Sequence, residues 1–538
     1  MAGALLVRLG YLQVVEQDFL RRQGFLRTFR QIPLNAFRGM IVDRNGEPLA
    51  VSTPVDSVWV DPKQVDWHQN AWQQAFALLT LNPESTREKI QQQISRDFYY
   101  LKRQISPEVA KKIDALQLSG VYLQREYRRY YPAGEVAAQL VGFTNIDDIG
   151  QDGLELAFDK FLRGSPGYKQ IIRDRYGSQI EGLARAKEPQ DGHNIILSID
   201  KRLQYLAYRE LAQAVVDQGA KAGALVLLDA KTGEVMAMAN YPSYNPNQRN
   251  RQVKENLRNR IMTDTFEPGS VMKSFSMANA LIHSHYPPGY TIDASPGWMK
   301  VGTNIVKDIH HFGVLDLPGI LRKSSNVGIA QLTLPLKPDY LVNTLTQFGF
   351  GEITYSGFPG ESSGYLPSPT VWRPFELATL SFGYGLSVTQ IQLAQAYSII
   401  AANGQKRPIT FLKQSHPVAG TTVVSPEAMR ELSAMLHSVT QAGGSGTRAR
   451  IPGYEVAGKT GTVKKIGDSG YSTNHYLSLF GGYAPFENPR LVAVIMIDDP
   501  SGSRYYGGEI AAPVFSRVMG EALRILNVPI PPPQKQEG

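Results

Sequence analysis

An uninterrupted apolar run near the C-terminus limits what this chain can fold into. Leu491 to Ile497 are seven apolar residues in a row, enough for a β-strand that is buried on both faces. No position in the run is polar, so neither face of such a strand is suited to water. The second half of the chain is therefore predicted to enclose a central sheet.

Segments on both sides of the run extend this sheet and flank it. Residues 202–216 place apolar side chains along one helical face, and residues 224–228 and 235–238 read as apolar strands joined by a turn. Pro513 is expected to start a second helix with an apolar stripe. The pattern predicts an α+β domain: a sheet flanked by an N-terminal and a C-terminal helix, with a long, largely helical insertion after the second strand.

The length of the chain indicates more than one domain. At 538 residues it exceeds what one hydrophobic core usually organises. Residues 183–192 are polar enough for a linker, so a domain boundary is placed near residue 190. Ahead of it, residues 38–50 predict a hairpin with Asn45-Gly46 as its turn. Residues 529–538 carry four prolines and no core pattern, and are predicted to be disordered.

Composition excludes several kinds of chemistry. The chain has no cysteine, which rules out disulfides, thiolate zinc sites and cysteine nucleophiles, and which suits an oxidising compartment. Its formal charge of +8 suits an anionic partner such as a phospholipid surface. Because no arginine-rich helix or Lys/Arg block occurs, nucleic acid is not the expected partner.

The N-terminus is apolar but short. Met1 to Val15 is interrupted by Arg8 and falls short of the roughly 20 residues that a membrane-spanning helix needs. It also lacks the charged start and the cleavage site of a secretory signal. Two interpretations stay open: an amphipathic surface helix, or the last turns of a membrane anchor.

Three motifs follow one another along the chain: Ser270-Val-Met-Lys273, Ser324-Ser-Asn326 and Lys459-Thr-Gly-Thr462. Together they supply a nucleophile, a base, a proton relay and a carboxylate clamp, as acyl transfer through a serine ester requires. None is specific alone, because each has further copies in the chain. These copies are Ser198–Lys201, Ser243–Asn245, Ser472–Asn474 and Lys231–Gly233.

Local context separates Ser270 from the copy at Ser198. Ser270 follows a Pro-Gly turn and is predicted to begin a helix, which places Lys273 one turn further on the same side. The positive end of the helix dipole would then lie near a developing oxyanion. Ser198 reads as part of a strand, so Ser198 and Lys201 would not share a face. The alternative for Ser270 is an ordinary helix-cap serine beside a solvated lysine.

The other two motifs are also weighed by their surroundings. Residues 456–463 are small and β-branched, which predicts a strand at the lip of a cleft, where Gly458 and Gly461 would leave room for a substrate backbone. An exposed strand with ordinary polar residues is the alternative. Ser324 is expected in a loop or at a helix start. His310 and His311 would point opposite ways on a regular element, so no metal site is predicted.

These residues resemble the class B penicillin-binding proteins, the peptidoglycan D,D-transpeptidases, from about residue 15 to residue 526. The Phe266 and Tyr131 segments are most similar to the division-specific, FtsI-like members, with the elongation-specific enzymes as the near alternative. Family members commonly read Ser-Thr-Val-Lys-Pro, and this chain departs from that pattern at Val271, Met272 and Ser274. The segments that carry the resemblance are Arg38-Gly-Met-Ile-Val-Asp-Arg-Asn-Gly, Tyr131-Pro-Ala-Gly-Glu, Phe266-Glu-Pro-Gly-Ser, Lys323-Ser-Ser-Asn-Val-Gly, Ser381-Phe-Gly-Tyr-Gly-Leu and Tyr505-Tyr-Gly-Gly.

The resemblance implies a multidomain α+β architecture. Residues 191–528 would form the penicillin-binding transpeptidase domain, with a five-stranded antiparallel sheet flanked by helices and an all-helical subdomain. Residues 21–190 would form an elongated pedestal for dimerisation or interaction. Residues 1–20 would be the remnant of a single membrane anchor, and residues 529–538 a disordered tail.

The resemblance also implies the chemistry, on the D-Ala-D-Ala end of a peptidoglycan stem peptide. Lys273, with its pKa lowered by burial and by Lys459, would take the proton of Ser270. Ser324, oriented by Asn326, would pass a proton to the leaving D-alanine before a neighbouring stem's amine attacks the ester. No metal or organic cofactor is expected. The remaining expected roles are the oxyanion amides of Ser270 and Thr462, the carboxylate clamp of Lys459, Thr460, Gly461 and Thr462, and the cleft wall of Tyr505 and Tyr506.

Partners and location follow from the same resemblance. They are β-lactams as covalent inhibitors, an FtsW-like membrane glycosyltransferase with other division proteins, and a lipid bilayer through the anchor, with no nucleic acid. The catalytic domain would lie in the periplasm, held to the bacterial inner membrane at the division septum. Two rivals stay open: a β-lactamase-like hydrolase, for which Glu361 is the candidate base, and a non-catalytic sensor or scaffold.

Overall fold

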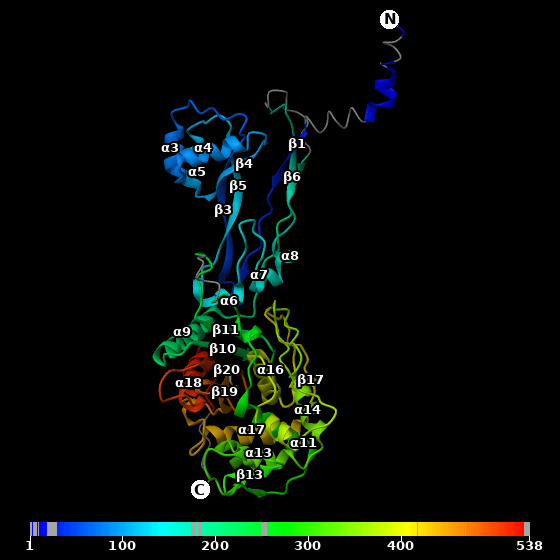
Figure 1. Ribbon diagram of the computed structural model, residues 1–538, viewed down its shortest axis with the longest axis vertical. Helices are drawn as coiled ribbons and strands as arrows, with labels where there is room; N and C mark the ends of the chain where they lie inside the picture. The colour runs from blue at the N-terminus through cyan, green and yellow to red at the C-terminus, as the bar shows by residue number, and fades with distance from the viewer. Residues whose placement is uncertain are drawn as a thin grey trace.

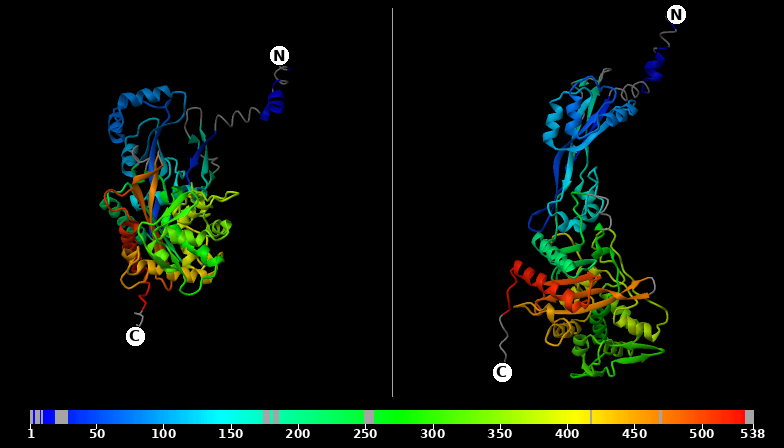
Figure 2. Two further views of the ribbon diagram at one scale, coloured as in Figure 1. Left: turned by 60° about the horizontal axis from the view of Figure 1, so that its bottom comes forward. Right: turned by 60° about the vertical axis from the view of Figure 1, so that its left-hand side comes forward.

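The chain folds into two parts that lie end to end, a narrow N-terminal part and a broader C-terminal part (Figure 1). Two further views show the same elongated outline (Figure 2). The computed structural model describes residues 3, 8, 10–18, 29–173, 179–180, 186–248, 256–416, 418–467 and 470–531.

The apolar run forms β20 (Leu491–Asp498), the middle strand of a five-stranded sheet in the order β11-β10-β20-β19-β18. All of its residues are buried, which confirms the predicted strand. Val494 pairs with Val226 on one side and with Gly481 on the other, and every pairing in this sheet is antiparallel. The other strands are β10 (Ala222–Asp229), β11 (Val235–Tyr241), β18 (Ala457–Gly467) and β19 (Gly470–Ala484).

Helices cover both faces of this sheet. Leu225 and Leu227 belong to the core shared with α9 (Lys201–Asp217) and α18 (Gly507–Ile525). Alternate residues such as Val226 belong to a second core, shared with the insertion between β11 and β18. This alternation is the period-two pattern of a strand, and it confirms the flanking helix predicted over residues 202–216.

The prediction that Pro513 starts the last helix is wrong. Helix α18 begins at Gly507 and contains Pro513. The Gly507 amide donates to Thr462 Oγ1 at 3.0 Å, and a Cβ at Gly507 would lie 2.2 Å from the Gly461 carbonyl oxygen. Because Gly507 has no side chain, α18 can begin in direct contact with β18, ahead of Pro513.

The insertion is largely helical, as predicted. Helix α16 is buried along its whole length, so it forms the centre of this layer. The elements of the insertion are α10 (Arg260–Thr263), η4 (Gly269–Met272), α11 (Lys273–His283), β12 (Thr291–Asp293), β13 (Trp298–Val301), β14 (Asn304–Lys307), β15 (Val314–Asp316), α12 (Leu317–Lys323), α13 (Asn326–Thr333), α14 (Pro338–Gln347), α15 (Pro374–Ser381), α16 (Gln390–Ala401), β16 (Gln405–Lys406), β17 (Thr421–Thr422), α17 (Pro426–Thr440) and η5 (Thr447–Ala449).

Long antiparallel strands form the N-terminal part. Strand β3 pairs with β5 from Val51 to Val60 and with β4 on its other edge, and helices α3, α4 and α5 share a core with this sheet. A second antiparallel pair, β1 with β6, forms a separate arm (Figure 1). The elements are β1 (Phe29–Leu34), β2 (Ile41–Val42), β3 (Pro48–Val60), α3 (Trp72–Leu79), α4 (Pro83–Gln92), β4 (Tyr99–Ile105), α5 (Pro107–Asp114), β5 (Val121–Tyr130), η2 (Gly134–Ala137), α6 (Ala138–Val141), α7 (Gly153–Ala157), α8 (Asp159–Leu162), β6 (Gly167–Arg173), β7 (Gln179–Ile180), β8 (Ala186–Lys187) and β9 (Ile195–Ile196).

The hairpin predicted over residues 38–50 forms between β2 and β3, with Ile41 opposite Ala50. Its loop is wider than the two-residue turn that the sequence suggests. The Asp43 carboxylate accepts from the amides of Asn45 and Glu47, both at 2.8 Å, so a side chain rather than a tight turn holds the loop.

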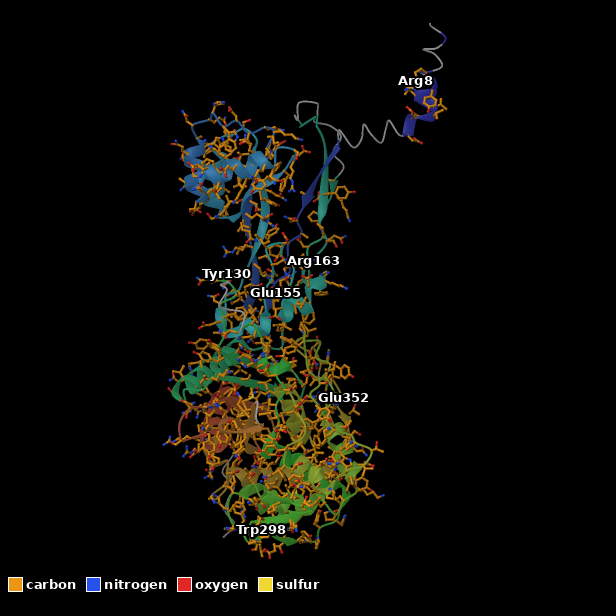
Figure 3. The ribbon with its side chains drawn as sticks, viewed as in Figure 1. Arg8, Tyr130, Glu155, Arg163, Trp298 and Glu352 are labelled. Atoms are coloured by element: carbon orange, nitrogen blue, oxygen red, sulfur yellow. The ribbon has the colours of Figure 1, made fainter. Side chains whose placement is uncertain are left out.

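A buried ionic network lies within the N-terminal part, near its junction with the C-terminal part, where Figure 3 labels Glu155. Arg38 Nη2 and Arg129 Nε each lie 2.6 Å from a Glu155 carboxylate oxygen, and Arg38 Nη1 lies 2.7 Å from Asp159. The side chains of Arg38 and Glu155 are 1% and 0% exposed. Water therefore cannot replace these partners.

The two chain ends are described only in part. Tyr11–Val15 form a short π-helix, η1, whereas part of the predicted anchor segment 1–20 lies outside the described residues. Residues 532–538 of the predicted tail also lie outside them. Among the described residues, no helix is both long enough and apolar enough to cross a bilayer.

Candidate active site

Ser270 lies in a 3₁₀ turn that leads directly into α11. The prediction that Ser270 begins the α-helix is wrong by one turn, because the α-helix starts at Lys273. Gly269 has φ +54°, and a Cβ there would lie 2.6 Å from Val463 Cγ2, so the turn packs directly against β18. Ser270 is partly exposed whereas Lys273 is buried, which leaves the nucleophile open to substrate and removes the amine from water.

Lys273 is the buried amine next to the nucleophile, with 1% of its surface exposed. Its Nζ donates to the Ser324 carbonyl at 2.5 Å and to the Ser324 hydroxyl at 3.1 Å. Burial lowers the pKa of Lys273 to about 7, and the Asp308 carboxylate opposes this shift. A substantial fraction of Lys273 is therefore neutral near pH 7 and able to accept a proton.

Ser324 connects the two lysines of the site. It lies between α12 and α13 with φ +61°, a left-handed conformation that is unusual for serine and costs free energy. Its hydroxyl accepts from Lys273 Nζ at 3.1 Å and from Lys459 Nζ at 3.0 Å. The strained backbone thus directs one hydroxyl toward two amines.

Lys459 lies on the edge strand β18 and is completely buried. Its Nζ donates to Ser324 Oγ at 3.0 Å, to the Thr460 carbonyl at 3.1 Å and to Thr460 Oγ1 at 3.4 Å. Burial, and then the charge of Lys273, lower the pKa of Lys459 well below its usual value. These contacts tie the Lys459 amine to Ser324 and to its own strand, and its expected role in the carboxylate clamp stays a prediction.

Asn326 does not orient Ser324 as expected. Its Nδ2 donates to the Lys307 carbonyl at 2.8 Å. The segment is held instead by Asp308, whose carboxylate accepts from Ser325 Oγ at 2.6 Å and from the Asn326 amide at 2.5 Å. Asp308 belongs to none of the motifs, so sequence reasoning missed it.

The substrate-binding residues predicted on β18 lie beside the nucleophile. Thr460 Oγ1 donates to Ser445 Oγ at 2.9 Å, and Thr462 is partly exposed, with its hydroxyl accepting from the Gly507 amide at 3.0 Å. A Cβ on Gly461 would lie 3.0 Å from Val271 Cγ1. This glycine therefore allows β18 to pack against the nucleophile's turn, rather than leaving space for substrate as predicted.

A cleft of about 570 Å³ brings these groups together. Ser270, Ser324, Thr460, Thr462 and Tyr506 all line it. Tyr505 does not: its ring stacks on Tyr476 at 4.1 Å between centroids and lines an adjacent hollow. The sequence analysis missed other residues at this cleft, of which Ser445, Arg448 and Glu509 offer polar or charged groups.

The further motif copies have local structural roles. Ser198 is buried and donates to the Val235 carbonyl at 2.7 Å. Lys231 lies in the turn between β10 and β11, and Ser243 donates to the Glu135 carbonyl at 2.7 Å. Ser472 lies on β19. None of these four residues lines the cleft that holds Ser270.

Two other predicted features can be placed. Glu361 accepts from Thr354 Oγ1 at 2.6 Å and from Ser356 Oγ at 2.8 Å, so its carboxylate holds a loop away from the cleft. His310 lines the cleft, whereas His311 contacts the Pro296 carbonyl. Within the described ranges, no group of three or more histidines and carboxylates is arranged to hold a metal ion.

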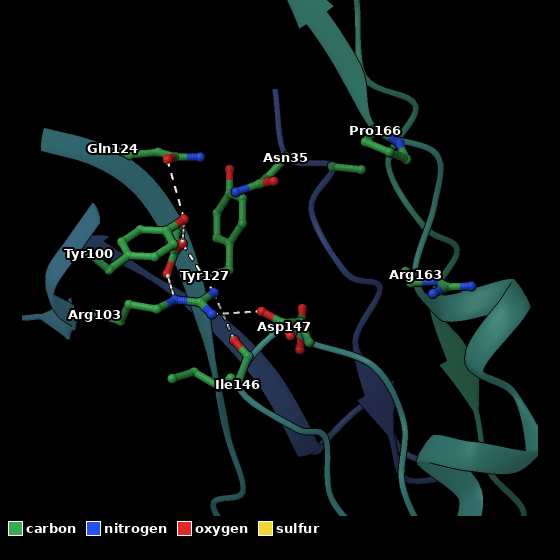
Figure 4. Close-up of a pocket in the computed structure, with 12 residues that line it drawn as sticks. Asn35, Tyr100, Arg103, Gln124, Tyr127, Ile146, Asp147, Arg163 and Pro166 are labelled. Atoms are coloured by element: carbon green, nitrogen blue, oxygen red, sulfur yellow. Dashed lines mark hydrogen bonds and ion pairs between the residues drawn. The ribbon is translucent and has the colours of Figure 1, made fainter. Parts of the chain in front are cut away.

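A separate cavity of about 290 Å³ lies in the N-terminal part (Figure 4). Arg103 is one of the residues that line it, and it pairs with Glu126 at 3.2 Å and with Asp147 at 2.7 Å. The residues that line this cavity include no serine or lysine. It therefore lacks the groups for serine acyl transfer, and the cleft at Ser270 is the candidate active site.

Comparison with known families supports this choice. Residues 223–520 match the penicillin-binding protein transpeptidase domain, and residues 33–197 match the penicillin-binding protein dimerisation domain. The chain is 43% identical to the peptidoglycan D,D-transpeptidase FtsI of Escherichia coli K12, over 97% of this chain and 90% of that protein. It is 41% identical to the probable peptidoglycan D,D-transpeptidase PbpC of Pseudomonas aeruginosa, over 97% of this chain and 92% of that protein.

Solved structures with the same architecture cover almost the whole chain. A peptidoglycan synthetase from Bifidobacterium adolescentis superposes with a TM-score of 0.76 at 25% identity, over 94% of this chain and 98% of the other. Penicillin-binding protein 3 from Mycobacterium tuberculosis, complexed with aztreonam, gives 0.72 at 28% identity, over 93% and 99%.

Proposed function

This chain belongs to the class B penicillin-binding proteins, and we propose that it is a serine-type D,D-transpeptidase that cross-links peptidoglycan stem peptides in septal wall synthesis through an acyl-enzyme on Ser270. One observation carries the proposal. The Ser324 hydroxyl accepts from two buried lysine amines, in the cleft that also exposes Ser270. Such an arrangement suits proton transfer to and from a serine nucleophile.

Acylation begins with a proton transfer. Neutral Lys273 takes the Ser270 hydroxyl proton while Ser270 Oγ attacks the penultimate D-alanine carbonyl of the donor stem. The backbone amides of Ser270 and Thr462 stabilise the oxyanion. The C–N bond then breaks, and Ser324 gives its proton to the leaving amine and receives one from Lys273. Lys459 supports this relay from the other side of the same hydroxyl.

Deacylation reverses these steps with a new amine. The amine of a neighbouring stem attacks the ester, a C–N bond forms, and Ser270 regains its proton as the C–O bond breaks. Thr460, Gly461 and Thr462 provide the strand edge and the hydroxyls that hold the substrate's end. Tyr506 bounds the cleft, and Tyr505 supports it from the adjacent hollow.

The finer biology is part of the proposal. The FtsI name of relatives at 43% identity favours division over elongation. We assign residues 21–190 to a pedestal and 191–528 to the transpeptidase domain, supported by the family matches at 33–197 and 223–520. The proposal also includes an anchor over residues 1–20 in the inner membrane and a catalytic domain in the periplasm. It further includes β-lactams as covalent inhibitors and an FtsW-like partner.

The rival functions have less support. A β-lactamase-like hydrolase needs a base that activates water against the ester, and the proposed candidate, Glu361, is engaged by Thr354 and Ser356. A degenerate scaffold would have no reason to keep two buried lysines around one strained serine.

Covalent labelling with a fluorescent penicillin tests the proposal. Wild type should form a long-lived adduct, and Ser270→Ala should form none, because the ester oxygen is removed. The matched control is Ser472→Ala, a serine of a further motif copy outside the cleft, which should label like wild type. Labelling of Ser270→Ala, or rapid turnover of penicillin by wild type, would contradict the proposal.

A further inference from the structure

The catalytic cleft holds several cations that differ in how they are paired. Lys459 has acceptors on Ser324 and Thr460, and Lys273 donates to the carbonyl and the hydroxyl of Ser324. Lys323 donates to the Gly443 carbonyl at 3.0 Å. Arg448 also lines the cleft, and within the part of the chain that the structure describes no carboxylate, carbonyl or aromatic ring pairs with its guanidinium.

The backbone of Arg448 is held by packing and hydrogen bonds, whereas its side chain is exposed. It lies in the 3₁₀ turn η5, where the next residue, Ala449, is fully buried and its amide donates to the Gly446 carbonyl at 2.9 Å. A Cβ on Gly508 would lie 2.3 Å from the Ser445 carbonyl oxygen, so the start of α18 packs directly on this segment. The side chain itself is exposed, which leaves the guanidinium free to meet a ligand.

The position of Arg448 matches the end of the donor substrate. Ser445, three residues earlier, accepts from Thr460 Oγ1, so η5 adjoins the strand whose hydroxyls are proposed to hold the substrate's end. An arginine guanidinium offers paired N–H donors that fit a carboxylate in a bidentate arrangement. The D-alanine that leaves the donor stem ends in a carboxylate, whereas the buried Lys459 amine already donates to Ser324 Oγ and to the Thr460 carbonyl.

We propose that Arg448 recognises the terminal carboxylate of the donor stem peptide, with the hydroxyls of Ser445, Thr460 and Thr462 beside it. This assignment rests on the proposed transpeptidase function. Lys459 then acts on Ser324 rather than on the substrate. Glu509 is the negative group at the same cleft, and among the described residues it forms no ion pair with Arg448, so the guanidinium is not already neutralised.

Two matched substrates test the assignment: a D-alanyl thioester whose leaving group carries a carboxylate, and the same thioester with that carboxylate converted to a primary amide. Thiol release can be followed directly because the chain has no cysteine. Wild type should prefer the carboxylate substrate in kcat/KM by about 10- to 100-fold, the range of a charge-assisted hydrogen bond. Arg448→Ala should remove the preference by slowing that substrate alone, and Arg448→Lys should keep part of it.

The control is Arg450→Ala, which removes the same charge two residues away; Arg450 bonds to Gln441 at 3.0 Å and does not line the cleft, so the preference should stay. Arg448→Ala should still label completely with fluorescent penicillin at long times, which separates failure of this assignment from failure of the proposed function. Equal slowing of both substrates, an unchanged preference, or a preference lost in Lys323→Ala but kept in Arg448→Ala would overturn the assignment.

Discussion

The chemistry of single residues depends on one hydroxyl that two amines share. Both amines are buried, and the pKa values of Lys273 and Lys459 are both lowered by that burial. Two full charges so close together in a dry site would repel each other. One lysine can therefore release its proton at neutral pH, and the Ser324 hydroxyl gives that proton a path between them.

The rate of acylation should rise with pH and then level off. This rising limb of the pH–rate profile should have an apparent pKa of about 7, the value for Lys273. Below this pKa, Lys273 is protonated and cannot accept the Ser270 proton; above it, the amine is neutral and acts as a base. Second-order acylation by a chromogenic cephalosporin, followed from about pH 5 to pH 9, measures the limb. A rate that falls as the pH rises through 7 would contradict Lys273 as the base.

The Asp308 carboxylate should set where this limb lies, because it raises the pKa of Lys273 against the effect of burial. Asp308→Asn should move the limb to lower pH. It should also destabilise the protein by about 1–3 kcal/mol, because the carboxamide keeps only one acceptor oxygen where the carboxylate accepts from both Ser325 Oγ and the Asn326 amide.

The matched control for this shift is Asp316→Asn. Asp316 caps α12 by accepting from the Gly319 amide at 2.7 Å. Asparagine caps a helix about as well as aspartate, so this change should remove the charge with little loss of stability and without moving the limb. An unmoved limb in Asp308→Asn, or an equal shift in Asp316→Asn, would contradict the electrostatic role of Asp308.

At the scale of elements, the site depends on how closely β18 approaches the nucleophile's turn. Gly269 and Gly461 form this contact, and side chains at either position would meet the opposite element. The edge strand and the start of α11 are therefore one packed unit. A small displacement of β18 changes the distance between Lys459 and Ser324 together with the oxyanion amides.

Replacing Gly461 with alanine should lower the acylation rate by about 10- to 100-fold, because displacing catalytic groups by even part of an ångström is costly. Overpacking should cost about 1–3 kcal/mol in unfolding free energy. Gly467→Ala on the same strand is the control, since its nearest neighbour would be the Gly470 carbonyl oxygen at an ordinary 3.7 Å. Stopped-flow acylation and thermal unfolding measure both effects, and equal behaviour of the two variants would contradict the packing argument.

Sequence patterns predicted the elements better than the contacts between them. The run 491–497 had to be a covered strand because it has no polar face. The order of the three motifs and the local context of each singled out Ser270, Ser324 and Lys459, which the structure brings to one site. Asp308 and Arg448 were missed because their roles depend on where the chain folds back, which no local spacing encodes. The Pro513 prediction failed because the Gly507 contacts that fix the helix start are tertiary.

At the scale of the whole molecule, a buried ionic network holds segments of the N-terminal part together. None of the proposed catalytic residues belongs to this network. Glu155 accepts from both Arg38 and Arg129 with its side chain fully buried. Removing one partner of a buried pair leaves the other charge without compensation. The network should therefore control the stability of this region and not the chemistry.

Glu155→Gln should destabilise the protein by about 3–5 kcal/mol, while the folded enzyme should acylate at the wild-type rate. The control is Glu47→Gln, which breaks an exposed pair with Lys201 at 3.4 Å and should cost no more than about 1 kcal/mol. Thermal unfolding by circular dichroism and cephalosporin acylation below the transition measure the two effects. A slowed reaction in folded Glu155→Gln would show that the network reaches the cleft.

The end-to-end arrangement of the two parts has a consequence for the architecture of the wall. The first described residues lie beyond the narrow part, and the domain that carries the cleft lies at the other end (Figure 1). With the N-terminus held at a membrane as proposed, the narrow part becomes a spacer of fixed height. The enzyme would then cross-link strands at a fixed distance from the bilayer. The length of the N-terminal part would set the thickness of the gap between the membrane and a new layer of wall.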